Sequence, residues 1–226
     1  MRILALLLLA SAAWPVHAQG PALVPGFGGE MLRVPVRSLA SIRTGATVLQ
    51  QYDFSCGSAA VATLLTHHYG HAVSEQDVLN AMYATGDQAK IRKDGFSLLD
   101  MKRYLQDLGY AADGFQQTLD RLAEARLPAI VLVNDNGYQH FVVVKGLRDG
   151  RILVGDPARG TLALPRAEFE KRWVGGLLFV VHSHVQQARF NRAEDWRAAP
   201  AAPLFSGVQR EAAVGTTLPR HNPGDF

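Results

Sequence analysis

The hydrophobic pattern of this chain changes its period near Pro128, and that change limits the fold more than any other feature. Between residues 57 and 126, apolar side chains recur every three or four positions, which is typical of amphipathic helices. After Pro128, short runs rich in β-branched residues follow one another, separated by the turn signals Asn136-Gly137 and Asp149-Gly150. Helices first and an antiparallel sheet afterwards predict an α+β fold.

Capping residues and glycines give approximate bounds for these elements. Ser74, Ser97 and Thr118 are suitable N-caps, while Gly70 and Gly109 are suitable stops. The helices expected from these signals are 57–69, 75–83, 98–108, 118–126 and 168–173, with a polar loop at 86–95. The expected strands are 31–36, 110–115, 128–133, 140–144, 152–154, 160–164 and 177–181.

The chain divides into four expected parts. Residues 1–18 have a basic start, a short apolar run and a small-residue cleavage site, so we interpret them as a signal peptide that directs the chain to the periplasm. Residues 19–46 are rich in Pro and Gly and predict an irregular lead-in. The folded domain is expected at 47–182, and an extended or disordered tail at 183–226, with wrapping of this tail around the domain as the alternative.

Composition excludes several classes of protein. The chain has 226 residues, 48% of them hydrophobic, which is enough for one good core. Its formal net charge is only +3, without a basic run, so we expect no nucleic-acid partner. After signal removal, no stretch is apolar and long enough to span a membrane.

Cys56 is the only cysteine, and its context indicates a reactive thiol. Exported proteins usually keep their cysteines in disulfides, so a single one is inert, intermolecular or reactive. Cys56 stands where a turn-rich segment meets the start of a helix, and the helix dipole there favours a thiolate. We therefore interpret Cys56 as a nucleophile, with a buried structural thiol as the alternative.

A nucleophilic thiol requires a base, an orienting group and a donor for the oxyanion. His140 opens an apolar strand directly after a turn, and Asp156 follows the neighbouring strand, so the two lie near one edge if the register suits. Gln50 lies six residues before Cys56 and can donate its amide to an oxyanion, although Gln51 competes for that role.

Five motifs, in this order and spacing, resemble the bacteriocin-processing cysteine peptidases, which cleave double-glycine leaders and are papain-like. The motifs are Gln50-x5-Cys56-Gly57-x-Ala59-Ala60, His68-Tyr69-Gly70, Gly95-Phe96-Ser97, Gln139-His140-Phe141-Val142-Val143 and Gly155-Asp156-Pro157-Ala158. The resemblance covers about residues 47–182. It implies Cys56 as nucleophile, His140 as base, Asp156 as orienting carboxylate and Gln50 as oxyanion donor.

The resemblance also has consequences for the function. The family usually has Asp before the nucleophile, whereas this chain has Ser55, and no transporter segment follows. The chain therefore resembles the free-standing exported branch, which is similar to the peptidase of functional-amyloid secretion systems. That implies an exported endopeptidase acting on a secreted peptide or protein, with cleavage after Gly-Gly, in support of secretion or assembly. A secretion channel or a fibre-subunit system is the implied partner.

Three alternatives remain open at this level. A catalytically silent member of the family would bind a secretion substrate without cutting it. Other papain-like chemistry, such as transglutaminase-type transfer or cell-wall peptide hydrolysis, uses the same order of Cys, His and Asp. His67, His68 and His71 could bind a metal, but they have no nearby carboxylate or thiol, so we expect neither metal nor cofactor.

Overall fold

The computed structural model describes residues 21–25, 31–35 and 37–199, in two compact units that comprise residues 1–42 and 43–226. In the first unit, β1 (Pro21–Pro25) pairs antiparallel with β2 (Met31–Pro35). The strand predicted at 31–36 is therefore present, but the lead-in also contains a partner strand that no alternating pattern announced. The proposed signal peptide, 1–18, lies outside the described residues.

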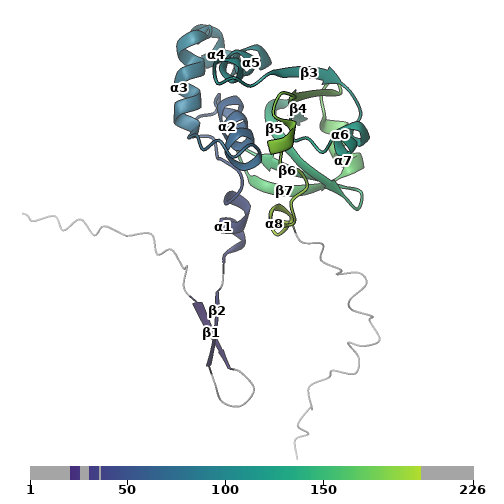
Figure 1. Cartoon of the computed structure of the whole chain (residues 1–226). Helices are drawn as coiled ribbons and strands as arrows, with labels where there is room; N and C mark the ends of the chain where they lie inside the picture. Colours follow the sequence, from purple (N-terminus) through teal and green to yellow (C-terminus); the bar gives the residue numbers. More distant parts are fainter. Residues whose placement is uncertain (1–20, 26–30, 36, 200–226) are drawn as a thin grey trace, which may run out of the picture. The chain divides into compact units, whose positions relative to one another are not determined.

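The second unit contains a six-stranded, fully antiparallel sheet with the order β3-β8-β4-β5-β6-β7 (Figure 1). Its strands are β3 (Ala112–Gln116), β4 (Ala129–Asp135), β5 (Tyr138–Arg148), β6 (Arg151–Asp156), β7 (Gly160–Pro165) and β8 (Leu177–Val181). Positive φ angles at Asn136, Gly137, Asp149 and Gly150 allow the two tight turns beside β5, as the sequence predicts.

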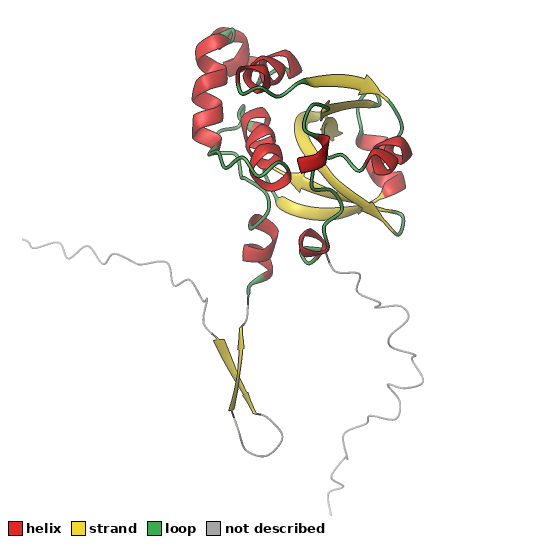
Figure 2. Cartoon of the chain, in the orientation of Figure 1, coloured by secondary structure: helices red, strands yellow, loops and turns green. Residues whose placement is uncertain are grey.

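Helices cover both faces of this sheet, and the predicted α+β class is confirmed (Figure 2). In the second unit the α-helices are α2 (Cys56–Thr63), α3 (Glu75–Thr85), α4 (Gln88–Asp94), α5 (Leu98–Asp107), α6 (Leu119–Ala125), α7 (Arg166–Arg172) and α8 (Ala193–Trp196). A further helix, α1 (Leu39–Thr44), begins in the first unit and has no buried residue. A π-helical turn, η1 (Leu64–His68), extends α2, and a 3-10 turn, η2 (Val185–Gln187), precedes α8.

Alternation along the central strand divides the core into two clusters. Phe141 and Val143 of β5 pack with α2, α3 and α5, whereas Val142 and Val144 pack with α6 and α7. Successive strand residues point to opposite faces, so the continuous apolar run of β5 is buried on both faces of the sheet. The sheet is thus a fixed middle layer from which residues at the ends of the strands can be positioned accurately.

The register of β5 against β6 shifts by one residue at Lys145. Val144 pairs with Val154, but Gly146 pairs with Leu153, so Lys145 is the extra residue of a β-bulge. A side chain at Gly146 would clash with the backbone, because a Cβ there would lie 2.9 Å from Cα of Asn191.

Two sequence predictions need correction. The polar loop predicted at 86–95 contains α4, which Asp87 caps through a hydrogen bond from the Lys90 amide and which buries Ile91. The tail predicted as extended or disordered from residue 183, with wrapping around the domain as the alternative, packs on the domain as far as Ala199, because Trp196 is buried and its ring lies under Arg148 and Arg151. Residues 200–226 lie outside the described part.

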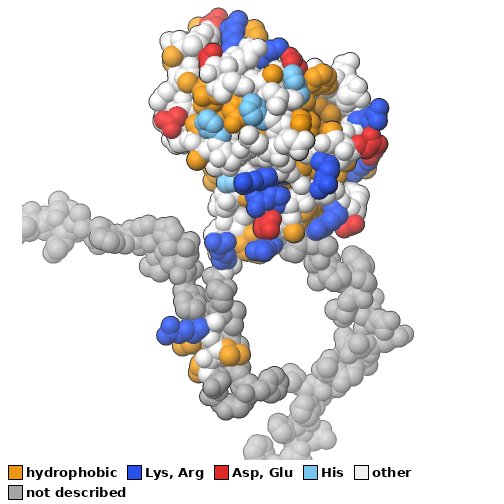
Figure 3. Space-filling view, in the orientation of Figure 1, with side chains coloured by type: hydrophobic (Ala, Val, Ile, Leu, Met, Phe, Trp, Pro, Cys, Tyr) orange, Lys and Arg blue, Asp and Glu red, His pale blue; other side chains and the backbone are white. Residues whose placement is uncertain are grey.

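Lys and Arg side chains gather on the part of the second unit that carries α8 (Figure 3). Among the described residues, no helix combines the length and the apolar character that crossing a bilayer requires.

Candidate active site

Cys56 is the first residue of α2, as predicted, and only 7% of it is exposed. The turn before it is fixed by Ser55, whose hydroxyl donates to the Tyr52 carbonyl (3.0 Å) and accepts from the Tyr52 amide (3.1 Å). Gly57 allows α2 to approach its neighbours closely, since a Cβ there would lie 2.8 Å from Met101 Cε. Serine in place of the family's usual aspartate therefore still closes the turn that presents the thiol.

Burial raises the pKa of the Cys56 thiol above its ordinary value, although the backbone N–H groups of Phe141, Gly57 and Cys56 itself act in the opposite direction. The helix start does contribute two of these groups, as expected. Desolvation is the larger influence, so the resting side chain is a neutral thiol rather than the thiolate that the helix dipole alone predicts.

His140 and Asp156 lie against each other, with His140 Nε2 3.4 Å from Asp156 Oδ2. The register explains this contact: Val143 pairs with Gly155, so the next step places Asp156 opposite Val142, on the same face as His140. Both residues are buried, at 4% and 1% exposure. The condition that the sequence left open, a suitable register, is met.

The Asp156 carboxylate is held in its ionised form. Burial alone would raise its pKa, but hydrogen bonds from His140, the Ala158 amide and Arg159 outweigh burial and lower the pKa to about 2. The other ring nitrogen of His140, Nδ1, is buried and has no hydrogen-bond partner among the described residues. A histidine that donates from Nε2 to a carboxylate keeps Nδ1 free to accept a proton.

Cys56 opens into a cleft of about 370 Å³, whose wall includes Tyr138 and Gln139, the two residues before His140. The residues that line this cleft are Asp53, Phe54, Cys56, Arg92, Lys93, Asp94, Gly95, Tyr138 and Gln139. Tyr138 stacks on the His140 ring, with centroids 5.5 Å apart, and its hydroxyl donates to the Asp53 carbonyl (3.1 Å). Tyr138 thus links the cleft wall to the imidazole.

The side chain of Gln50 is engaged elsewhere in this structure. Its amide Nε2 donates to the Tyr52 carbonyl (3.0 Å), while its backbone N–H donates to the Pro157 carbonyl (2.9 Å) and fixes it next to the Asp156 segment. The amide nitrogen of Gln50 carries two N–H groups, so the one that does not bond Tyr52 is the donor that an oxyanion would use.

The three histidines considered as metal ligands have other environments. His68 is fully buried, its Nδ1 lies 2.5 Å from the Arg189 carbonyl, and burial lowers its pKa to about 3, so it is a neutral core residue. Across the described ranges, no group of three or more His, Cys, Asp or Glu side chains is arranged to hold a metal ion.

Sequence reasoning missed Tyr138 and Arg159. Tyr138 could have been found, because it lies two residues before His140 on a strand and therefore shares its face. Arg159 could not, because its contact with Asp156 depends on the conformation of the turn between β6 and β7.

Comparisons with known proteins agree with one another. A family model described as "Peptidase C39 family" matches residues 45–184. The "Probable functional amyloid protease FapD" of Pseudomonas aeruginosa is 40% identical over 179 residues, which cover 79% of this chain and 78% of that protein.

Two further likenesses are more partial. The "Lactococcin-G-processing and transport ATP-binding protein LagD" of Lactococcus lactis subsp. lactis is 31% identical over 135 residues, covering 58% of this chain and 18% of that protein. Among solved structures, the peptidase domain of Streptococcus ComA, a bifunctional ABC transporter, matches with a TM-score of 0.50 and 23% identity, over 60% of this chain and 97% of that domain.

Proposed function

The chain belongs to the peptidase C39 family and is a cysteine-type peptidase, and from that premise we propose that it cleaves a secreted peptide or protein with Cys56 as nucleophile. The observation that carries this assignment is the state of His140. Its Nε2 faces Asp156, while its buried Nδ1 has no partner in the described part of the chain. A base in that state is oriented, and it has one acceptor position left for a proton.

The proposed reaction begins with a neutral thiol. As Cys56 Sγ attacks the scissile carbonyl carbon, its proton passes to Nδ1 of His140, and Asp156 stabilises the resulting imidazolium. The negative charge on the substrate oxygen is met by the Cys56 backbone N–H and by the Gln50 amide N–H that is not bonded to Tyr52. His140 then protonates the leaving amine and finally activates the water that hydrolyses the thioester.

For the substrate, we propose a segment with Gly-Gly before the cleaved bond. The support is the resemblance of the five motifs to peptidases that cleave double-glycine leaders, together with the match to a bacteriocin-processing transporter. In a pocket that is closely fitted to glycine, one added methyl group is expected to lower kcat/KM about 10- to 100-fold. Peptides that differ only in Gly-Gly, Gly-Ala and Ala-Gly test this directly; equal rates on all three would reject it.

We further propose that the enzyme works in the cell envelope after export, where it serves a secretion or fibre-assembly system. The support is the apolar N-terminal segment 1–18 together with the similarity to the functional amyloid protease. Fractionation of cells producing the full chain, followed by N-terminal sequencing, should recover a protein that begins near Gln19 in the periplasmic fraction. Recovery from the cytoplasm with Met1 intact would contradict this location.

The central experiment measures cleavage of the candidate substrate by the parent, Cys56→Ala and His140→Ala. We expect activity to vanish in Cys56→Ala while substrate binding persists, because truncating the thiol leaves the cleft wall in place. A parent that binds the substrate without cutting it would instead establish the silent binding module. Mass spectrometry of the products separates hydrolysis from acyl transfer to an amine.

A further inference from the structure

The carboxylate of Asp156 is held from a second side, by residues that the reaction above does not use. We propose that Arg159 and Asp135 form a positioning pair that fixes the Asp156 carboxylate in the orientation that His140 requires. This inference rests on the proposed function of the Cys56 site and identifies two further residues on which that site depends.

The lengths of three contacts indicate which groups orient the Asp156 carboxylate. Arg159 Nε lies 2.8 Å from Oδ2, the same oxygen that lies 3.4 Å from His140 Nε2. The Ala158 amide donates to Oδ1 at 2.8 Å. The contact with His140 is therefore the longest of the three, and the two shorter bonds determine how the carboxylate plane is turned.

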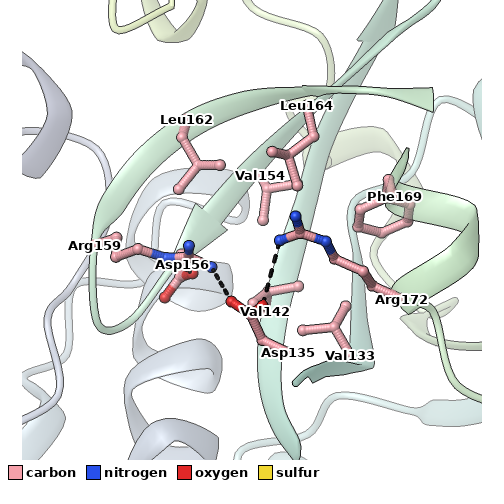
Figure 4. Close-up of a pocket in the computed structure, with 10 residues that line it drawn as sticks. All are labelled: Val133, Asp135, Val142, Val154, Asp156, Arg159, Leu162, Leu164, Phe169 and Arg172. Atoms are coloured by element: carbon pink, nitrogen blue, oxygen red, sulfur yellow. Dashed lines mark hydrogen bonds and ion pairs between the residues drawn. The ribbon is translucent and has the colours of Figure 1, made fainter. Parts of the chain in front are cut away.

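Arg159 alone would be a poor anchor, because about half of its side chain is exposed (49%) and a long flexible side chain loses entropy when it is held. Asp135, at the end of β4, supplies the second contact: its Oδ2 lies 3.3 Å from Arg159 Nη2. Arg172 of α7 approaches the other oxygen of Asp135, at 3.6 Å. Figure 4 shows Arg159 and Arg172 reaching Asp135 from two sides.

The pair differs from an ordinary surface ion pair in two respects. Exposed ion pairs contribute little, but Arg159 also contacts Asp156, whose carboxylate is 1% exposed and is poorly screened by solvent. Asp135 and Asp156 also line one small cavity, of about 10 Å³, which has room for about one water molecule. The other residues that line this cavity are Arg159, Arg172 and six apolar side chains, so little water reaches Asp156 on this side.

Arg159 and Asp135 carry opposite charges, so removing one or the other should shift the pH dependence of activity in opposite directions. Residues with a purely structural role would not produce opposite shifts. Arg159 is a cation beside the carboxylate that faces His140, and a cation there disfavours a protonated imidazole. Asp135 offsets that charge. Removing Arg159 should therefore move the acid limb of activity to higher pH, and removing the charge of Asp135 should move it to lower pH.

The experiment measures kcat and KM against pH for the parent, Arg159→Ala, Arg159→Lys and Asp135→Asn. Arg121→Ala is the matched control, because Arg121 forms an exposed ion pair with Glu124 on α6. In Arg159→Ala we expect kcat to fall about 10- to 100-fold with little change in KM, as expected for losing a hydrogen bond to a charged group. Arg159→Lys should restore the acid limb, because the charge returns, but only part of kcat.

The rate of Cys56 alkylation by iodoacetamide, followed against pH in the same variants, supplies a readout that needs no substrate. Opposite shifts in Arg159→Ala and Asp135→Asn support the positioning pair, even if the parent cleaves no peptide and the proposed function fails. Shifts in one direction, unchanged limbs, or an equal loss of kcat in Arg121→Ala would overturn it. Circular dichroism and the Tm of each variant identify any that fails to fold. If Arg159→Ala does not fold, the test is whether Arg159→Lys keeps the acid limb of the parent while its kcat is lower.

Discussion

Strand β5 carries two buried acid–base pairs, and only one of them lies beside the cleft. His140 contacts Asp156 near the start of the strand, whereas Lys145 contacts Asp195 of α8 at the bulge, with 3.6 Å between Nζ and Oδ2. All four residues are buried, at exposures between 0% and 6%. The two pairs are alike in burial and differ in what surrounds them.

The difference lies in how completely each base is bonded. Lys145 Nζ donates to the Ala46 carbonyl (2.5 Å) and to Thr161 Oγ1 (3.4 Å) besides its ion pair. His140 has one nitrogen bonded and one left over. A fully bonded pair can join the C-terminal segment 182–199 to the sheet, whereas a pair with a free acceptor can move a proton. The same kind of interaction therefore serves packing in one place and chemistry in the other.

The largest expected effect comes from neutralising the acid of each pair in turn. Asp156→Asn should lower kcat/KM about 10²- to 10⁴-fold, because the amide no longer stabilises an imidazolium. Asp195→Asn should leave kcat/KM within about threefold, measured well below its Tm. Steady-state assays of both variants test the comparison, and a similar loss in both would mean that the two pairs are not separate in role.

The second effect is on stability. Asp195→Ala leaves the Lys145 ammonium buried without its counter-ion, which should lower the free energy of unfolding by about 3 kcal/mol. The double variant Lys145→Met, Asp195→Leu should recover most of that loss, since no charge then remains buried. Urea denaturation provides the measurement. A loss below about 1 kcal/mol in Asp195→Ala would contradict the anchoring role.

The third effect is a pH dependence of stability at the Lys145 pair. Burial lowers the pKa of Lys145 to about 8, against 10.5 for a free lysine. Between these values the unfolded chain binds more protons, so the free energy of unfolding rises with pH. From pH 8 to 9.5 the parent should gain about 1.6 kcal/mol relative to Lys145→Met, because Lys145 is already half deprotonated in the folded state at pH 8. If the free energy of unfolding changed by the same amount in the two proteins between these pH values, the prediction would be contradicted.

The smallest effect concerns how the C-terminal segment is held. Arg148 lies over the Trp196 ring at 4.5 Å from its centroid, and Arg151 lies at 5.2 Å. Arg148→Gln should cost about 0.5–1 kcal/mol of stability, the usual contribution of an exposed cation–π contact. Arg197→Gln, an exposed arginine next to Trp196, is the matched control in thermal unfolding. Equal losses in the two variants would assign the effect to net charge.

Much of the fold could be predicted because its signals are local. Ser74 and Ser97 cap α3 and α5 as expected, and the two turns beside β5 lie where Asn-Gly and Asp-Gly occur. The predicted papain-like α+β fold and cysteine-peptidase family are confirmed. The roles of Cys56, His140, Asp156 and Gln50 remain predictions for the experiments above.

What could not be predicted depends on contacts between distant parts of the chain. The pKa of the Cys56 thiol depends on how deeply the cysteine is buried, and no local signal gives that depth. The backbone of Gln50 is fixed beside the Asp156 segment because its N–H donates to the carbonyl of Pro157, which lies far along the chain. The packing of α8 depends on Asp195 meeting Lys145, which lies 50 positions earlier in the chain and in a strand that otherwise reads as apolar.

The bulge at Lys145 determines which insertions the hairpin of β5 and β6 can tolerate. If the ladder ran unbroken from the Asp149-Gly150 turn, Asp156 would stand opposite Val143, and His140 would project from the other face of the sheet. Whether His140 and Asp156 share a face therefore depends on whether the number of residues between His140 and the turn is odd or even. The extra residue in the bulge changes that number by one and places both on the same face. That residue is itself the base of the second pair, so one position in the chain both brings Asp156 to His140 and anchors the C-terminal segment. Insertions of one residue in either arm of this hairpin should be far more damaging than insertions of two.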